Sequence, residues 1–428
     1  MDNPYALCPV DRESREFRLL QLQPNNNNED IIKCNMQTYN LKNYSCYTAL
    51  SYTWGANATC TNIEINGIKV PVRENLWDFL HQQLLHGNYG LFWIDALCIQ
   101  QSEVHERNHQ VRMMTSIYED AQLVLIWLGK ESDDSDLAMR TLIDWEWCNP
   151  STLRYMFANN NKISNTLLAR GTKSVATWNT RVVLSVLSLC KRRYWSRMWI
   201  IQEVVHAERV EIHCGSEILE WYKFEQLYYY AGFISRYYKE MDTPFYNAVR
   251  SSPAMSIVKI RAEPHWYTCS PDLLGRPRDI AIDSLMETYS AHECEDIRDK
   301  VYAIVGIAKN GSTIVVDYRK SAKDVLLDVF YHAGTEMRWK AKWREDELFR
   351  IGQLLERVLK VPFLETEIRF HIDRSHGLTA NLVGYDENDY GDFFRSVDLA
   401  RKELDGTTSH IALDNLTLNC FLNHHKLH

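Results

Sequence analysis

Two carboxylates lie in segments that are otherwise mostly apolar and aromatic, and they are the first candidates for chemistry in this chain. Asp95 follows the apolar run of residues 91–94, and Glu203 lies within residues 199–205. Removing an unpaired carboxylate from water is costly, so such a residue is usually paired, capped or part of a site. The search for a function therefore starts at these two positions.

Both carboxylates also have structural interpretations. Each can form an ion pair with a nearby arginine, and Asp95 can instead cap a loop. The arginines at suitable positions are Arg193 and Arg197 for Glu203, and Arg107 and Arg112 for Asp95. From the residues alone, the structural role is favoured for both carboxylates.

Two other groups of residues are weaker candidates. Cys98 with His105 or His109 has the residue types of a thiol nucleophile and its base, but a buried, inert thiol is favoured. The remaining candidate metal ligands are His206, His213 and Cys214. Their spacing matches no closed zinc pattern, so we expect no metal site.

Composition narrows the function classes. A chain of 428 residues with 45% apolar residues is expected to form two globular domains. The net charge of −8 is spread along the chain without a basic block, which argues against a nucleic-acid partner. No apolar run reaches membrane-spanning length, and residues 1–10 lack a secretory signal. The eleven scattered cysteines fit reduced thiols, so we expect a cytoplasmic protein.

The elements that must position the two carboxylates alternate along the first half of the chain. The predicted order is strand, helix, strand, helix, strand over residues 47–55, 75–84, 91–94, 102–121 and 123–128. This alternation predicts a parallel sheet flanked by helices. Hairpins are expected as additions to the sheet, one of them at Asn66-Gly67, where both turn positions need a positive φ.

The regular alternation of strands and helices ends after residue 128. Residues 131–180 have the composition of an insertion, and residues 199–206 predict the helix that carries Glu203. Beyond residue 225 strand signals become sparse, and helices are predicted at 322–335 and 348–359. We expect residues 225–428 to be mostly helical, and the sequence does not indicate their role.

Three ordered blocks resemble the fungal heterokaryon-incompatibility (HET) domain. They are residues 47–55, residues 92–101 with their continuation to Gly129, and residues 194–204. Gln100 departs from the pattern, since the family usually has Asn there. Residues 297–307 and 316–318 also resemble a segment that commonly follows this domain. The resemblance implies a HET domain over 1–224, with core motifs in 47–205 and an insertion at about 131–180, followed by a separate region over 225–428.

HET domains in turn resemble TIR domains, whose sheet is flavodoxin-like and some of which cleave NAD at the nicotinamide–ribose bond. The catalytic glutamate of those TIR domains lies in a Trp-x-x-x-Glu setting, and Trp199 and Glu203 have that spacing. Residues 50–52 resemble the first TIR strand, and residues 92–95 resemble the second. The resemblance implies an α/β, TIR-like parallel sheet with Glu203 as the catalytic carboxylate.

NAD cleavage needs few groups. Breaking the N-glycosidic bond passes through an oxocarbenium-like cation, which a carboxylate near the ribose stabilises. Nicotinamide is already cationic, so no strong acid is required. We expect tryptophan rings to stack on the base, backbone amides after a strand to approach a phosphate, and an arginine to suit the pyrophosphate. The substrate-binding residues implied are Ser51, Trp54, Gly55, Asp95, Arg197 and Trp199. NAD is then a substrate, and no cofactor is expected.

The resemblance therefore implies an effector of fungal nonself recognition, a form of innate immunity that ends in programmed cell death. We expect a homo-oligomer that completes the site, and an incompatibility partner protein. The alternative is a non-catalytic recognition module that triggers death through a protein partner. A HET-family enzyme acting on another nucleotide is a third hypothesis.

Overall fold

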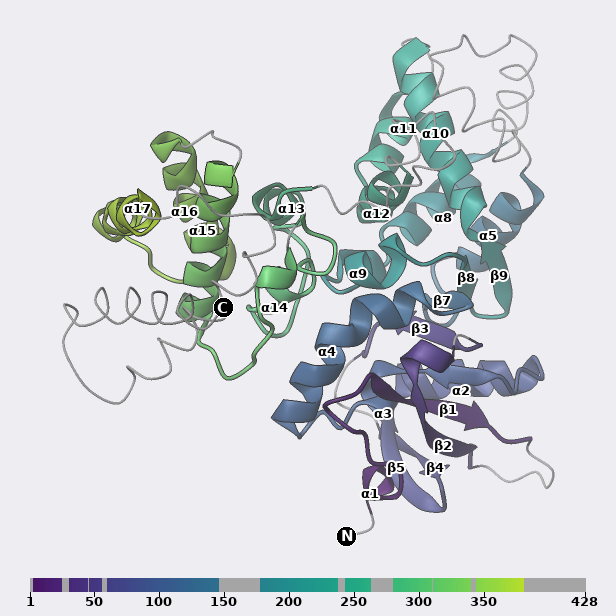
Figure 1. Ribbon diagram of the computed structural model, residues 1–428. Helices are drawn as coiled ribbons and strands as arrows, with labels where there is room; N and C mark the ends of the chain where they lie inside the picture. The colour runs from purple at the N-terminus through teal and green to yellow at the C-terminus, as the bar shows by residue number, and fades with distance from the viewer. Residues whose placement is uncertain are drawn as a thin grey trace. The chain divides into compact units, whose positions relative to one another are not determined.

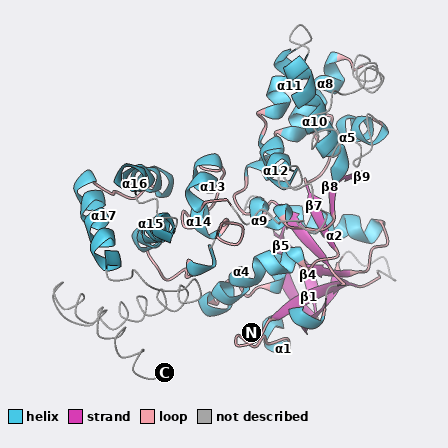
Figure 2. Cartoon of the chain, turned by 45° about the horizontal axis from the view of Figure 1, so that its top comes forward, coloured by secondary structure: helices cyan, strands magenta, loops and turns pink. Residues whose placement is uncertain are grey.

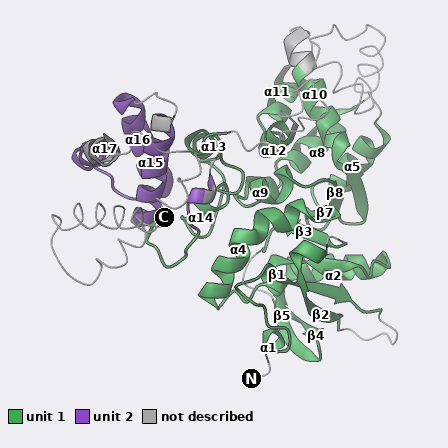
Figure 3. Cartoon of the chain, in the orientation of Figure 1, with its two compact units in different colours: residues 1–309, 316–322 green, residues 310–315, 323–428 purple. Residues whose placement is uncertain are grey.

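The computed structural model describes residues 3–24, 31–44, 46–55, 60–145, 178–237, 243–262, 280–309, 311–339 and 344–380. The chain divides into two compact units, which are unit 1 (residues 1–309 and 316–322) and unit 2 (residues 310–315 and 323–428), coloured separately in Figure 3. Unit 1 runs past residue 224, where the sequence places the end of the first domain, and that domain boundary stays a prediction.

Unit 1 is an α/β structure built on one sheet, whose described strands follow the order β5-β4-β2-β1-β6-β3-β7-β8-β9 (Figure 1, Figure 2). The strands are β1 (Glu16–Leu22), β2 (Lys33–Asn40), β3 (Thr48–Tyr52), β4 (Cys60–Ile65), β5 (Ile68–Arg73), β6 (Leu91–Trp93), β7 (Leu123–Trp127), β8 (Val210–Cys214) and β9 (Glu217–Glu220). The four neighbours β6, β3, β7 and β8 are parallel. The sheet as a whole is mixed, because β1 pairs antiparallel with both β2 and β6.

The parallel centre follows from the composition of its strands. In β3 and in β7, four of the five residues are buried. Strands buried on both faces are typical of parallel sheets covered by helices, and each parallel connection needs a crossover. The crossovers contain α2 (Glu74–Leu85), between β5 and β6, and α4 (Val104–Glu119), between β6 and β7. The predicted alternation of strands and helices around Asp95 is therefore confirmed.

The predicted hairpin at Asn66-Gly67 is also confirmed. Strands β4 and β5 pair antiparallel up to Ile65 and Ile68, and the two turn residues have φ values of 51° and 81°. Positive φ at both turn positions matches the right-handed twist of the flanking strands, which explains the Asn-Gly pair.

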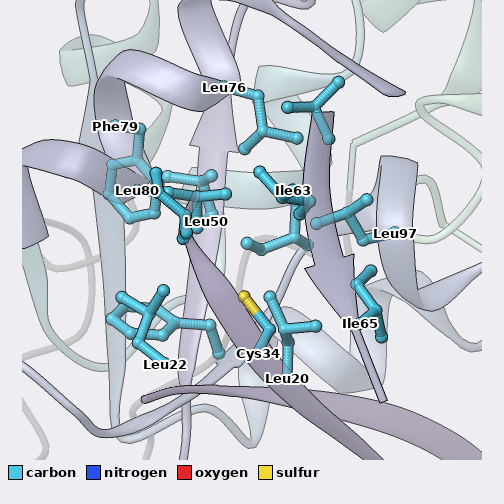
Figure 4. Packing of buried hydrophobic residues seen from close by; sticks show 14 of the residues in the cluster. Leu20, Leu22, Cys34, Leu50, Ile63, Ile65, Leu76, Phe79, Leu80 and Leu97 are labelled. Atoms are coloured by element: carbon cyan, nitrogen blue, oxygen red, sulfur yellow. The ribbon is translucent and has the colours of Figure 1, made fainter. Parts of the chain in front are cut away.

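One apolar cluster fixes the sheet against α2. Figure 4 shows side chains of β1, β2, β3 and β4 packed beside those of the helix, including Leu20, Leu50, Ile63, Phe79 and Leu80. Each of these five side chains is at most 1% exposed. Burying a side chain of this size contributes about 1.5–3 kcal/mol, so the cluster holds the ends of β3 and β6 in place.

The other described helices of unit 1 lie before, between and after the strands. They are α1 (Pro4–Leu7), η1 (Leu41–Asn43), α3 (Asp95–Cys98), α5 (Ser135–Asp144), α8 (Thr180–Cys190), η2 (Arg193–Ser196), α9 (Ile200–Val205), α10 (Trp221–Tyr237), α11 (Thr243–Arg250), α12 (Pro253–Ala262), α13 (Ile282–Thr288) and α14 (Asp299–Tyr302). The expected insertion at 131–180 begins with α5, and its residues 146–177 lie outside the described ones.

Unit 2 is helical where it is described. It contains η5 (Gly311–Thr313), α15 (Ala322–Trp339, apart from its first residue), α16 (Glu345–Leu359) and α17 (Glu365–Ala380). The two helices predicted in this part of the sequence are therefore confirmed. A side-chain carbon at Gly352 would come 2.9 Å from Ile368, so this glycine allows α16 and α17 to pack closely. Within the described part of the chain, no helix is both long and apolar enough to cross a membrane.

Candidate functional site

The hydroxyl of Ser51 lies at the centre of a buried hydrogen-bond chain. Ser51 is near the carboxyl end of β3, and its Oγ donates to Oε2 of Glu203 on α9. The same Oγ lies 2.6 Å from the hydroxyl of Tyr194, in η2. An ionised carboxylate only accepts hydrogen bonds, so the Tyr194 hydroxyl donates to Ser51 and Ser51 donates to Glu203.

Glu203 also forms an ion pair with Arg197. Nη1 and Nη2 of Arg197 each lie 3.3 Å from one carboxylate oxygen of Glu203. The Glu203 side chain is 1% exposed and that of Arg197 is 16% exposed. Burial acts to lower the pKa of Arg197, but the charges of Glu203 and Asp95 outweigh it and raise that pKa. A buried carboxylate needs such a partner, and the ion pair offered by the sequence is present.

Asp95 is the first residue of α3 and lies shortly after the end of β6. Part of the residue is exposed to solvent, although its carboxyl group is buried. Its Oδ2 accepts the indole N–H of Trp54 at 2.9 Å, and its Oδ1 accepts its neighbour's amide, that of Ala96, at 2.7 Å. Burial of the carboxyl, and then the charge of Glu203, raise its pKa to about 6 against the opposing effect of Arg197. Asp95 therefore belongs to the same electrostatic cluster as Glu203.

The arginines that the sequence offered to Asp95 are used elsewhere. Arg107 stacks over the ring of Tyr318 with its Cζ 4.1 Å from the centroid, and Arg112 donates to the carbonyl of Val316 at 2.9 and 3.1 Å. The predicted ion pair of Asp95 with either arginine is therefore wrong. Local sequence spacing favoured it, whereas α4 directs both side chains toward a segment two hundred residues downstream.

Trp199 is held by a different carboxylate. A hydrogen bond from its side chain and one of 2.7 Å from the Tyr318 hydroxyl reach Asp299, and both act to lower the Asp299 pKa. Burial nevertheless raises that pKa to about 6. The backbone of Trp199 opens α9, because its carbonyl accepts the amide of Glu203 at 3.2 Å. Among the expected ligand-binding residues, Ser51 and Arg197 both contact Glu203, and Trp54 contacts Asp95. The Trp199 side chain is instead tied to Asp299 on α14.

Gly55 supplies a backbone conformation close to this cluster. Its φ is 78°, which favours glycine, and its carbonyl accepts Nη1 of Arg73 at 3.0 Å. The guanidinium of Arg73 lies over the ring of Trp54, with 5.1 Å between Cζ and the ring centroid. Arg73 was not predicted as a site residue, because it lies at the end of a hairpin strand with no motif around it.

The turn that carries Arg197 is paired with the backbone of Glu293. The amide of Met198 donates to the Glu293 carbonyl at 2.9 Å, and the Glu293 amide donates to the carbonyl of Ser196 at 2.5 Å. Glu293 and Arg197 form an isolated parallel bridge. Backbone pairing leaves no side-chain signature, so the sequence could not reveal it. Tyr194, by contrast, lies within residues 194–204, the third of the ordered blocks, so the sequence could have identified it as a site residue.

The downstream segment also contacts α4. Asn108 donates to Asp317 Oδ1 at 2.9 Å and accepts the amide of Tyr318 at 3.1 Å. With its amide oriented to satisfy both polar atoms, Gln202 accepts the Thr115 hydroxyl at 2.8 Å and donates to the carbonyl of Ala303 at 3.3 Å. Glu293 and Ala303 therefore contact residues at the start of α9, the helix of Glu203, whereas Asp317 and Tyr318 contact α4.

The weaker candidates do not form sites of their own. Burial raises the pKa of Cys98 to about 12, which is the opposite of what an activated thiolate needs. Nε2 of His213 lies 3.5 Å from Glu211, and the Cys214 thiol contacts Ser135 at 3.4 Å. Among the described residues, no three His, Cys, Asp or Glu side chains are grouped as metal ligands.

Comparisons with known proteins bear on the segment that holds this cluster. The family model described as "Heterokaryon incompatibility protein (HET)" matches residues 47–203. Over 153 residues the chain is 32% identical to "Heterokaryon incompatibility protein 6, OR allele" of Neurospora crassa, an alignment that covers 33% of this chain and 22% of the relative. No solved structure matches the chain.

The matched interval contains Ser51, Trp54, Asp95, Arg197 and Glu203. The fold brings these residues together near the carboxyl ends of the inner strands β3 and β6. The alignment spans only about a fifth of the relative, so it characterises this segment and not the whole protein. Residues 47–203 of the chain are a domain of the heterokaryon-incompatibility (HET) family.

Proposed function

We propose that this protein is an effector of heterokaryon incompatibility, acting in nonself recognition and regulated cell death by hydrolysing NAD at the nicotinamide–ribose bond. The HET domain and the name of the Neurospora relative support the biological role. The observation that carries the chemical part is the buried Ser51–Glu203–Arg197 cluster at the carboxyl end of β3.

Strand order supports a TIR-like, flavodoxin-like core. Numbered in chain order as first to fourth, the parallel strands β3, β6, β7 and β8 have the spatial order 2-1-3-4. This is the order of flavodoxin-like sheets, in which ligands bind outside the carboxyl ends of the strands where the winding direction reverses. That point lies between β3 and β7, and Ser51 is the second-last residue of β3.

Glu203 is the proposed catalytic carboxylate. When the C1′–N bond breaks, its electron pair passes to the ring nitrogen and neutral nicotinamide leaves, while positive charge develops on the ribose. The carboxylate stabilises that charge, and water then adds to C1′ and loses a proton. Ser51 and Arg197 hold the Glu203 oxygens in place before substrate arrives.

In the present geometry both oxygens of Glu203 are occupied, so binding must displace one donor. Arg197 keeps 16% of its side chain exposed, and it is the group best placed to move onto the substrate's pyrophosphate. We propose that assembly into a homo-oligomer favours this rearrangement. A lethal activity would then stay silent in the isolated chain.

The test is NAD consumption by the purified full chain, alone and under forced oligomerisation, with Glu203→Gln as the isosteric variant and Glu203→Ala as its companion. We expect nicotinamide release by assembled wild-type protein and a loss of at least roughly 100-fold in both variants. Equal NAD levels with the wild-type and variant proteins in every assembled form would overturn the proposal.

The Glu203–Arg197 ion pair itself favours a second candidate function. A carboxylate that is 1% exposed and already neutralised has the features of a structural anchor in a non-catalytic recognition module. In that case toxicity depends on a protein partner. Glu203→Gln would then leave cell killing intact wherever the protein still folds, and NAD levels would not change before death.

A further inference from the structure

Arg73 is an arginine with unused donors beside the proposed site. It is the last residue of β5, and its side chain is 22% exposed. Nη1 donates to the carbonyl of Gly55, and the guanidinium lies over the ring of Trp54. Its Nε and Nη2 form no hydrogen bond with any residue in the described part of the chain.

The position of Arg73 connects it directly to the cluster. The Trp54 ring on which it stacks donates its indole N–H to Asp95, the neighbour of Glu203 in the electrostatic cluster. Burial raises the pKa of Tyr52, and the charges of Asp95, Arg197, Arg73 and Glu203 all act on the same hydroxyl. Arg73 and Arg197 thus both lie within electrostatic range of the end of β3.

We propose that Arg73 is a specificity-determining residue that binds a phosphate of the substrate through its free Nε–Nη2 edge. The inference rests on the proposed function and narrows it, since it makes the substrate a nucleotide and not a nucleoside. A guanidinium edge with two parallel N–H groups matches two phosphate oxygens. Stacking on Trp54 and the bond to Gly55 hold that edge in one orientation, which reduces the entropy lost on binding.

The acidic neighbour of Arg73 does not block this role. Glu295 Oε1 lies 3.9 Å from Nη1 of Arg73, and the Glu295 side chain is 83% exposed. Such a surface pair contributes little, and it involves Nη1 and not the Nε–Nη2 edge. A phosphate would compete with Glu295 for the positive charge, so Glu295→Gln should strengthen binding modestly.

The experiment compares three substrates that share the scissile bond and differ in phosphate content: nicotinamide riboside, nicotinamide mononucleotide and NAD. Steady-state kinetics are measured on the assembled full chain for wild type, Arg73→Met, Arg73→Lys and Glu295→Gln. The matched control is Arg140→Met, which removes a positive charge that is 63% exposed and pairs with Glu217.

For Arg73→Met we expect a roughly 10- to 100-fold higher KM for NAD, the size expected for loss of one charge-assisted hydrogen-bonded pair. The kcat should change little, and nicotinamide riboside should be cleaved as by wild type. Arg73→Lys should recover part of the loss, since lysine keeps the positive charge but lacks the two parallel N–H groups of the guanidinium. An equal loss of kcat/KM on all three substrates would show that Arg73 only supports the backbone at Gly55, and the proposal would be wrong.

A binding measurement separates this proposal from the proposed hydrolysis. Calorimetry with NAD and nicotinamide riboside is performed on Glu203→Gln with and without Arg73→Met, after circular dichroism shows that each variant is folded. Binding of NAD that depends on Arg73 would uphold the phosphate site. If the wild-type protein then shows no turnover of NAD in any assembled form, hydrolysis is rejected while the phosphate site stands. Binding of NAD that is indifferent to Arg73, or no binding of NAD, would overturn the phosphate site.

Discussion

Ser51 and Glu203 are separated by 152 residues in the chain, yet the hydroxyl of one donates directly to the carboxylate of the other. The contact joins the end of β3 to α9, and both residues are at most 1% exposed. Arg197 neutralises the same carboxylate from the turn before α9. The cluster therefore couples the position of α9 to the sheet, and the charge of Glu203 is neutralised only while Arg197 is present.

Removing Arg197 should destabilise the fold strongly. Arg197→Met leaves Glu203 buried without a counter-charge, and breaking a buried pair on one side typically costs about 3–5 kcal/mol. The double variant Arg197→Met/Glu203→Gln should recover most of this loss, because the uncompensated charge is gone. Urea unfolding of the wild type, the two single variants and the double variant measures the coupling. Additive effects would mean that the ion pair contributes nothing specific.

Stability should depend on pH through Asp299. Burial raises the pKa of its carboxyl to about 6 in the folded protein, and the unfolded value is about 3.9. Between these values the folded state binds more protons than the unfolded state. The contribution of this group therefore favours folding below about pH 4 and is lost as the pH rises through 6, a change of roughly 2–3 kcal/mol.

The measurement for Asp299 is the difference in unfolding free energy between wild type and Asp299→Asn at several pH values. Asparagine keeps an acceptor for Tyr318 but does not titrate in this range. The advantage of the wild type should shrink from pH 4 to pH 6.5. Glu13→Gln, at an exposed carboxylate, should show no such trend, and a flat difference for Asp299→Asn would contradict the prediction.

Gly306 should tolerate no side chain. An added Cβ would collide with the hydroxyl of Thr115 on α4, which is held in place by its hydrogen bond to Gln202. Gly306→Ala should therefore cost about 1–3 kcal/mol, the usual effect of overpacking. Adding Thr115→Ala removes the colliding hydroxyl and should recover part of the loss. Thermal unfolding of the two single variants and the double variant tests this, and a neutral Gly306→Ala would be evidence against the close approach.

Local patterns predicted the elements well, because their causes are local. Asn66-Gly67 needs positive φ at both positions, and the apolar runs at β3 and β7 need burial on both faces. The antiparallel entry of β1 beside β6 was not predicted. It depends on pairing Leu20 with Phe92, which hydrophobicity alone does not specify.

For the candidate site, the sequence singled out residues that lie close together, but it did not predict their contacts. Glu203 and Arg197 are six residues apart, so their pair was an explicit alternative. The bond of Trp54 to Asp95 and the stacking of Arg73 join separate elements, and no spacing encodes them. The catalytic role of Glu203 and the substrate-binding roles of the other residues stay predictions for the experiments above.

The bridge between Arg197 and Glu293 has a consequence for how such genes can recombine. Residue 293 lies 90 positions beyond the end of the interval that matches the HET family, yet it supplies the acceptor for the amide of Met198. A crossover between two alleles anywhere from residue 204 to 292 would combine a turn from one parent with a bridging strand from the other. Because backbone groups form the bridge, such a hybrid should keep it unless position 198 or 293 is proline, so the two segments can diverge in sequence without losing their contact.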